Sequence, residues 1–91
     1  MEETYFPMSA ICYSILTALQ EGNNNAILKA VPVAAIMEMD DVRGVSSGAV
    51  YKAIDVLLGR QLIARGVKVA NANTFFITKK GVEHLSAACG E

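Results

Sequence analysis

Residues that could bind an anion gather in one short segment in the middle of the chain. Ser46, Ser47 and Gly48 stand together, and Tyr51 and Lys52 follow shortly after them. At the start of a helix, free backbone N–H groups and the positive dipole end accommodate a phosphate. A glycine lets the backbone approach closely, and tyrosine and lysine side chains supply further phosphate contacts. The segment therefore predicts a phosphate-binding helix start.

Each of these residues also has an ordinary structural interpretation. Ser46 and Ser47 suit a simple helix N-cap, a role that is compatible with phosphate contact. Tyr51 could instead be a partly exposed aromatic side chain that packs on a neighbouring hairpin. A second polar group follows later in the chain and consists of Lys68, Asn71, Asn73 and Thr74. These residues could contact a nucleic-acid backbone, or they could be solvated turn residues.

A helix over residues 46–58 must position the first group. Val50, Ile54 and Leu57 recur at helical spacing and mark its buried face. The opposite face is polar and carries Ser47, Tyr51, Lys52 and Asp55. The pattern thus predicts an amphipathic helix whose outer side is available to a ligand.

The surrounding segments predict a small set of further elements. A first helix is expected from Ser9 to Leu19, capped by Ser9 and ended by Gly22. An extended link over Ala26–Ala30 and a second helix from Pro32 to about Met39 follow. The remaining expectations are a hairpin over residues 62–78 with its turn at 70–73, and a last helix over residues 79–88 capped by Thr78.

This order predicts one domain over residues 1–91, mainly α with a β-hairpin wing, which is an α+β winged helix-turn-helix. The charge pattern supports a face directed at phosphate. Residues 43–80 hold seven bases and one acid, a net charge of +6, whereas residues 1–42 have a net charge of −5. Such asymmetry is expected when one face meets a polyanion.

Several motifs resemble those of PadR-like transcriptional regulators. The segment over residues 47–54 resembles the family's recognition helix, with Gly48, Val50 and Tyr51 at matching positions and Ala49 where threonine is usual. Residues 75–81 resemble its second wing strand and the entry to its last helix, with Lys79 in place of an acid. Residues 11–21 resemble its opening helix.

The resemblance implies a DNA-binding regulator whose third helix enters the major groove and whose wing contacts the backbone. The implied DNA-binding residues are Ser46, Ser47, Gly48, Tyr51, Lys52, Lys68, Asn71, Asn73 and Thr74. The wing tip lacks the family's arginines, and the chain ends at Glu91 with little of the family's dimerisation helix. A homodimer would therefore use the first helix, the C-terminal helix or both.

Other chemistry finds no motif in the sequence. Cys12 and Cys89 lack a metal-ligand spacing, His84 is alone, and no catalytic constellation is present, so we expect neither an enzyme nor a cofactor or metal. Met37 and Met39 suit packing. The acidic N-terminus and the lack of a long apolar run predict a cytoplasmic protein.

Two hypotheses remain open at the level of sequence. The first is a regulator that binds double-stranded DNA. The second is a winged-helix module that binds a protein partner, such as an accessory or inhibitor protein, without binding DNA. The second is favoured by the uncharged wing tip and by a composition of 53% apolar and only 19% charged residues, which leaves apolar surface for a partner.

Overall fold

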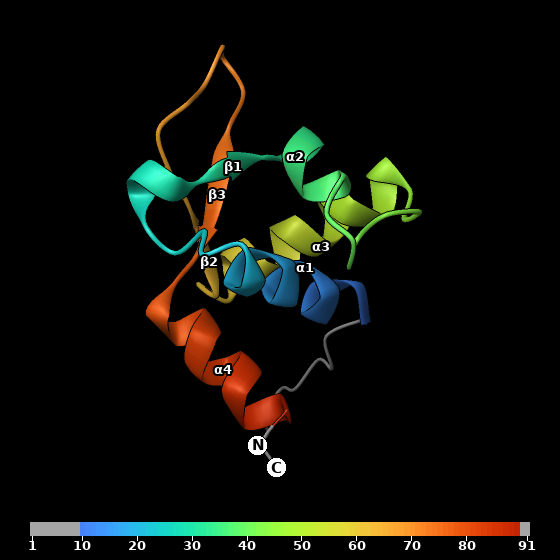
Figure 1. The fold of residues 1–91 in the computed structure, drawn as a ribbon, viewed down its shortest axis with the longest axis vertical. Helices are drawn as coiled ribbons and strands as arrows, with labels where there is room; N and C mark the ends of the chain where they lie inside the picture. The colour runs from blue at the N-terminus through green and yellow to red at the C-terminus, as the bar shows by residue number, and fades with distance from the viewer. Residues whose placement is uncertain (1–9, 90–91) are drawn as a thin grey trace.

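The computed structural model describes residues 10–89 and arranges them as helices packed around a small antiparallel sheet, with a long hairpin projecting from one end (Figure 1). The elements are α1 (Ala10–Glu21), the 3-10 turn η1 (Ile27–Lys29), β1 (Val31–Pro32), α2 (Val33–Met37), α3 (Ser47–Gly59), β2 (Ile63–Arg65), β3 (Thr74–Ile77) and α4 (Lys79–Cys89). This order confirms the predicted winged-helix arrangement and adds η1 and β1 to it.

Helix α1 ends at a left-handed residue that differs from the predicted one. Asn23 has φ +59°, whereas Gly22 does not adopt a positive φ. The N–H of Asn24 donates to the carbonyl of Leu19 at 2.9 Å, as in a Schellman end. Asparagine tolerates this conformation, so the residue after the glycine ends the helix. The predicted cap, Ser9, lies outside the described residues.

The segment after α1 corrects two expectations. Ala26–Ala30 is not an extended link but contains the 3-10 turn η1, and the strand begins only at Val31. Pro32 is not the first residue of α2; it is the N-cap residue, and its backbone is extended. Helix α2 ends at Met37 rather than at Met39. Five residues without a period could not distinguish a strand from a tight turn.

The sheet has the order β1-β3-β2 and is antiparallel throughout. Val31 pairs with Phe75, and Ile63 pairs with Ile77, so β3 lies in the middle. The sequence predicts a hairpin over residues 62–78, but the regular pairing of β2 with β3 stops at Arg65 and Phe75. Beyond them the two arms continue as the wing, joined near the tip by a bridge between Val69 and Ala72.

The wing tip is a two-residue turn. Ala70 and Asn71 both have positive φ, +51° and +67°, while Val69 and Ala72 exchange backbone hydrogen bonds at 3.0 and 2.9 Å. Two consecutive left-handed residues are typical of a type I′ turn, whose twist suits a hairpin. The predicted turn region is thus confirmed, with the alanine in a conformation that this residue type rarely adopts.

The hydrophobic core lies between α1, α3 and the sheet. Its fully buried members include Ile15, Leu19, Ile36, Leu57 and Ile77, one or more from almost every element. Cys12 is buried in the same cluster, as expected for a small apolar side chain, and its thiol lies 3.9 Å from the carbonyl oxygen of Ala53. The side chain of Cys89 lies outside the described part.

Helix α4 is attached to the core at its first turn. Thr78 caps it as predicted, because its hydroxyl accepts from the N–H of Gly81 at 3.0 Å and donates to the carbonyl of Gln61 at 2.8 Å. A Cβ atom at Gly81 would collide with the carbonyl oxygen of Leu62. Further along, the rings of His84 and Tyr13 stack with centroids 6.0 Å apart, which joins α4 to α1.

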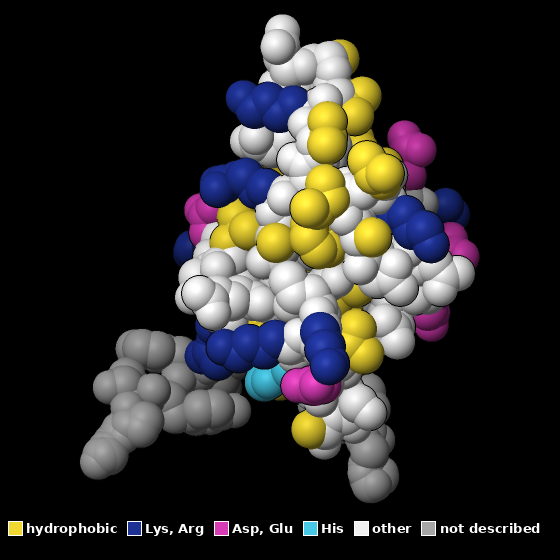
Figure 2. Space-filling model, turned by 90° about the vertical axis from the view of Figure 1, so that its left-hand side faces the viewer, with side chains coloured by type: hydrophobic (Ala, Val, Ile, Leu, Met, Phe, Trp, Pro, Cys, Tyr) yellow, Lys and Arg dark blue, Asp and Glu magenta, His cyan; other side chains and the backbone are white. Residues whose placement is uncertain are grey.

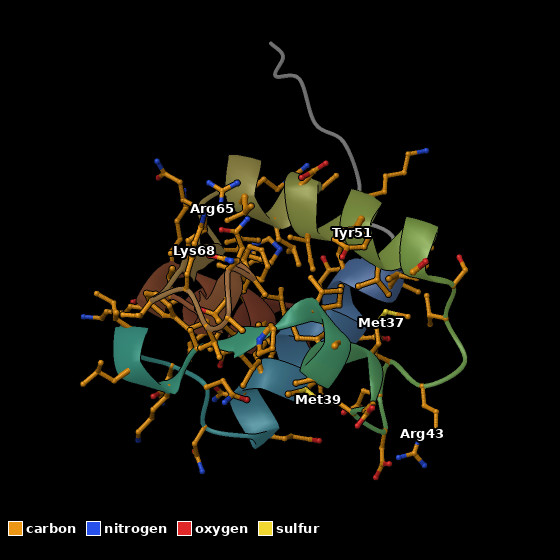
Figure 3. All side chains as sticks on the ribbon, turned by 90° about the horizontal axis from the view of Figure 1, so that it is seen from above. Met37, Met39, Arg43, Tyr51, Arg65 and Lys68 are labelled. Carbon is orange, nitrogen blue, oxygen red and sulfur yellow. The ribbon has the colours of Figure 1, made fainter. Side chains whose placement is uncertain are left out.

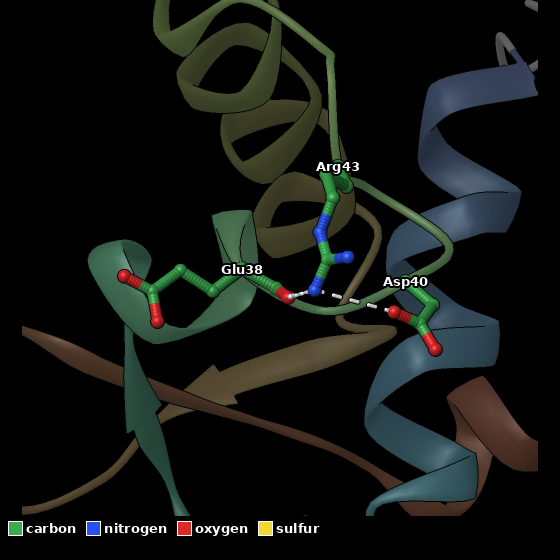
Figure 4. A network of polar contacts seen from close by, with 3 residues as sticks. All are labelled: Glu38, Asp40 and Arg43. Atoms are coloured by element: carbon green, nitrogen blue, oxygen red, sulfur yellow. Dashed lines mark hydrogen bonds and ion pairs between the residues drawn. The ribbon is translucent and has the colours of Figure 1, made fainter.

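In the connection between α2 and α3, the side chain of Arg43 contacts both Glu38 and Asp40 (Figure 4). The guanidinium of Arg43 donates to the carbonyl oxygen of Glu38 at 3.1 Å and lies 3.3 Å from the carboxylate of Asp40. The side chains of Arg43 and Asp40 are 71% and 92% exposed, so the ion pair itself contributes little free energy. The carbonyl contact ties the connection to the C-cap residue of α2.

Candidate nucleic-acid interface

The start of α3 has the predicted geometry. Ser46 is the N-cap residue, and its hydroxyl accepts a hydrogen bond from the N–H of Ala49 at 3.3 Å. Ser46, Ser47 and Gly48 are exposed, and nothing lies within 4 Å of where a Cβ of Gly48 would be. The N–H of Ala49 is therefore used by the cap, while the serines and the glycine face solvent and are open to a ligand.

The outer face of α3 is exposed and its inner face is buried, as the periodicity predicted. Val50, Ile54 and Leu57 are at most 3% exposed, whereas Tyr51 is 56% exposed and Lys52 is exposed as well. A hollow of about 250 Å³ separates α3 from the hairpin, and it is lined by Pro32, Val33, Ala34, Tyr51, Ala72, Asn73 and Phe75. Tyr51 thus lies beside the hairpin and also remains accessible.

The hairpin brings Asn73 of the second predicted group close to Tyr51 of the first, since both line the hollow between α3 and the hairpin. Lys68, Asn71 and Asn73 are exposed on it. Seen from above, Tyr51 on α3 and Arg65 and Lys68 of the hairpin all lie in the upper half of the view, with Arg65 and Lys68 to the left of Tyr51 (Figure 3). The candidate interface therefore consists of the outer face of α3 together with the adjacent wing.

Thr74 does not belong to this interface, and its assignment is a correction. Its side chain is fully buried, and its hydroxyl donates to the carbonyl of Val67 at 2.7 Å. A hydroxyl enclosed in this way cannot reach a ligand. Its position at the start of a strand next to exposed asparagines suggested a surface residue, but it holds the base of the wing together.

Arg65 is a candidate that the sequence-based selection of site residues omitted. It is the last residue of β2, is exposed, and pairs in register with Phe75. The alternation of buried Ile63 and exposed Arg65 in a short strand was the available signal. Arg65 and Lys68 together give the wing a cationic flank below its uncharged tip.

The bases of residues 43–80 do not form one surface, contrary to the simplest expectation from their clustering in sequence. Arg43 contacts Asp40 and lies on a different side of the molecule from Lys68 (Figure 3). Lys79 and Lys80 belong to the first turn of α4, at the other end from the wing (Figure 1). The positive charge at the candidate interface comes from Lys52, Arg65 and Lys68.

Other kinds of site find little support in the described part of the chain. Among residues 10–89, no group of three or more histidine, cysteine or acidic side chains is arranged to hold a metal ion. Within the same range, no helix combines the length and apolar character needed to cross a membrane.

The helices, the central β3 and the projecting hairpin define the chain as a winged helix-turn-helix protein of the α+β class. Two solved structures share this fold. TubR from Bacillus megaterium superposes with a TM-score of 0.77 at 22% sequence identity, over 91% of this chain and 88% of that one. A DNA-binding TubR fragment from Clostridium botulinum has a TM-score of 0.68 at 25% identity, over 91% and 99% of the two chains.

The comparisons at the level of sequence return nothing further. No family model matches the chain, and no curated protein matches it. The likeness to TubR structures supports a winged-helix regulator fold and does not confirm the PadR-like family.

Proposed function

We propose that this chain binds double-stranded DNA as a winged-helix transcriptional regulator, with α3 in the major groove and the wing on the phosphate backbone. The observation that carries the proposal is the exposure of Tyr51 and Lys68 on the same half of a fold shared with a DNA-binding TubR fragment. A helix of this size fits the major groove.

The proposal gives each residue a role. Ser46, Ser47 and Gly48 would receive a backbone phosphate at the start of α3. Lys68 and Arg65 would contact the backbone through the wing, and Asn71 and Asn73 would add hydrogen bonds from its tip and return arm. The side chains of Tyr51 and Lys52 would project into or along the groove from the exposed face of α3, about one and a half turns after its N-cap.

Salt dependence tests the electrostatic part of the proposal. Fluorescence anisotropy with a labelled duplex from upstream of its own gene should show affinity falling steeply as salt rises, because bound Lys and Arg release counterions. Lys52→Glu and Lys68→Glu should each weaken binding and lower the slope of log K against log salt by about 1. Lys80→Glu, on α4, is the matched control and should leave the slope unchanged.

Gly48→Ala separates DNA contact from folding. The added methyl group meets nothing within 4 Å, and alanine favours a helix, so stability should rise by up to about 1 kcal/mol. Affinity for DNA should nevertheless fall, because the methyl group would hold the backbone away from a phosphate. If the wild-type protein does not bind the duplex, or binds it with no dependence on salt, the proposal is overturned.

A protein-interaction module is the second candidate function. It is favoured by the exposure of Leu28, Val67 and Val69, which are 90%, 56% and 56% exposed. A pull-down that recovers one partner with both wild type and Lys52→Glu/Lys68→Glu, together with no DNA binding, would support it over the regulator.

Finer features of the regulator belong to the same proposal. The PadR-like subtype is supported by the positions of Gly48 and Tyr51 relative to the hairpin. A homodimer through α1 and α4 and a cytoplasmic location would suit a regulator that recognises a symmetric operator. Sedimentation of the protein bound to a symmetric duplex tests the dimer, which should place two copies on each duplex.

A further inference from the structure

The 3-10 turn η1 holds two large apolar side chains in solvent. Leu28 is 90% exposed and Ile27 is 55% exposed. The turn is well anchored, because the amide of Asn24 donates to the carbonyl of Lys29 at 2.8 Å while the carbonyl of Asn24 accepts from the N–H of Ile77 at 2.8 Å. A fixed turn that presents a leucine to water indicates a contact surface rather than a fraying loop.

The wing extends this surface. The turn lies against the base of the hairpin, where a Cβ at Gly66 would be only 2.7 Å from the carbonyl oxygen of Ile27. Figure 2 shows hydrophobic side chains forming a column down this side of the molecule, flanked by Lys and Arg. We define the apolar face by its large exposed side chains, which are Ile27, Leu28, Val67 and Val69.

A groove of complementary character lies on another side of the same chain. It has a volume of about 340 Å³ and is lined by Ala18, Glu21, Gly22, Glu38, Met39, Asp40 and Asp41. Half-buried Met39 and buried Ala18 supply apolar surface, while the other lining residues include four acidic ones, Glu21, Glu38, Asp40 and Asp41. We call this the acidic groove. Met39 lies on a different side of the molecule from Lys68 (Figure 3).

The carboxylates of the acidic groove repel one another. A hydrogen bond with the carboxyl of Asp41, followed by the negative charge of Asp41, raises the pKa of Glu21 above its ordinary value. Asp40 is offset by Arg43 at 3.3 Å. A cation placed between Glu21 and Asp41 would relieve the repulsion, and Lys29, which follows Leu28 in the sequence, is exposed.

We propose that the apolar face of one copy docks into the acidic groove of a second copy, with Leu28 against Met39 and Lys29 between Glu21 and Asp41. The two surfaces are complementary, because each has an apolar part and because Lys29 is positive whereas the groove is acidic. They lie at different places on one chain, so the contact is head-to-tail and can repeat from copy to copy. It leaves the outer face of α3 uncovered and does not depend on DNA binding.

The contact is small, so it should be weak and visible only at high protein concentration. Sedimentation velocity without DNA should show a weight-average mass that keeps rising with concentration. A dimer through α1 and α4 would instead saturate at two copies. A mass that does not rise beyond a dimer over the accessible range would overturn the proposal.

A charge exchange identifies the surfaces. Lys29→Glu alone and Glu21→Lys/Asp41→Lys alone should each lose the rise in mass, because each places like charges together. Mixing the two variants should restore it, since every contact between unlike variants again joins opposite charges. Lys80→Glu alone, which keeps both surfaces, is the control and should retain the rise in mass. A charge-exchange mixture that associates no better than its components overturns the proposal.

Leu28→Asp tests the apolar centre. Self-association should weaken about tenfold or more, because an apolar contact is lost and a charge enters an acidic surface. Unchanged thermal unfolding verifies the fold, as expected for a side chain that is 90% exposed. Unchanged self-association in this variant would exclude the apolar face as the contact.

Discussion

The base and the tip of the wing are built in opposite ways. At the base, Thr74 is fully buried, Phe75 is 4% exposed, and Gly66 lies so close to η1 that a side chain has no room. At the tip, Val67 and Val69 are each 56% exposed, and the turn rests on two left-handed residues. One hairpin therefore begins inside the core and ends entirely in solvent.

We therefore expect the base of the wing to determine stability and its tip to determine binding. Residues at the base hold the hairpin at a fixed angle to α3, so their substitution should lower the free energy of unfolding. Residues at the tip contact little of the protein, so their substitution should alter binding and leave folding almost unchanged. Each of the following variants tests this division, beginning with the largest expected effect.

Gly66→Ala should be the most damaging change. The added Cβ would lie 2.7 Å from the carbonyl oxygen of Ile27 and nearer still to the Cβ of Ala30, so either η1 or the strand must move. We expect a loss of about 1–3 kcal/mol in the free energy of unfolding, measured by urea denaturation.

Gly59→Ala is the matched control for that variant. Its Cβ would meet nothing within 4 Å, and Gly59 is the last residue of α3. Alanine in a helix should leave stability equal or raise it by up to about 1 kcal/mol. Equal losses in the two variants would contradict the close packing of the wing base.

Thr74→Val should destabilise the base without changing its shape. The hydroxyl that donates to the carbonyl of Val67 at 2.7 Å is removed, and the new methyl group occupies buried space. We expect a loss of about 1–2 kcal/mol, because one carbonyl loses its partner. Thr74→Ser retains the donor and should recover part of the loss in the same denaturation series.

Ala70→Gly should stabilise the tip slightly. Ala70 has φ +51°, which glycine adopts without a steric penalty. The gain should be about 0.5 kcal/mol, because the relief of strain is partly offset by the greater freedom of glycine in the unfolded chain. Ala72→Gly, without a positive φ, should show no such gain in melting temperature.

Val67→Ser together with Val69→Ser should have the smallest effect on folding. Both side chains are more than half exposed, so the free energy of unfolding should change by less than about 0.5 kcal/mol. Self-association through the apolar face should weaken measurably. A large loss of stability would show that the tip also supports the fold.

The sequence predicted the elements with strong periodicity and missed those formed by distant pairing. The spacing of Val50, Ile54 and Leu57 located α3, and the caps Ser46 and Thr78 were identified from local chemistry. Strand β1 could not be found in this way, because Val31 and Pro32 become a strand only through pairing with β3. Two residues carry no period.

The candidate interface was predicted in part for the same reason. Tyr51 and Lys52 follow from which face of one helix is apolar. Thr74 was misplaced because burial at a strand end depends on what the other arm of the hairpin covers. The clustering of bases along the chain did not predict their clustering in space. Arg43 lies in the connection between α2 and α3, where it pairs with Asp40, and Lys79 lies on α4, so neither belongs to α3 or the wing.

The two-residue turn at Ala70 and Asn71 limits how the length of the hairpin can change. Adding one residue to each arm moves the turn outward and preserves the pairing at the base. A single extra residue in one arm would rotate every later side chain to the opposite side and move Phe75 out of the core. Insertions and deletions in this hairpin are therefore expected to occur in even steps.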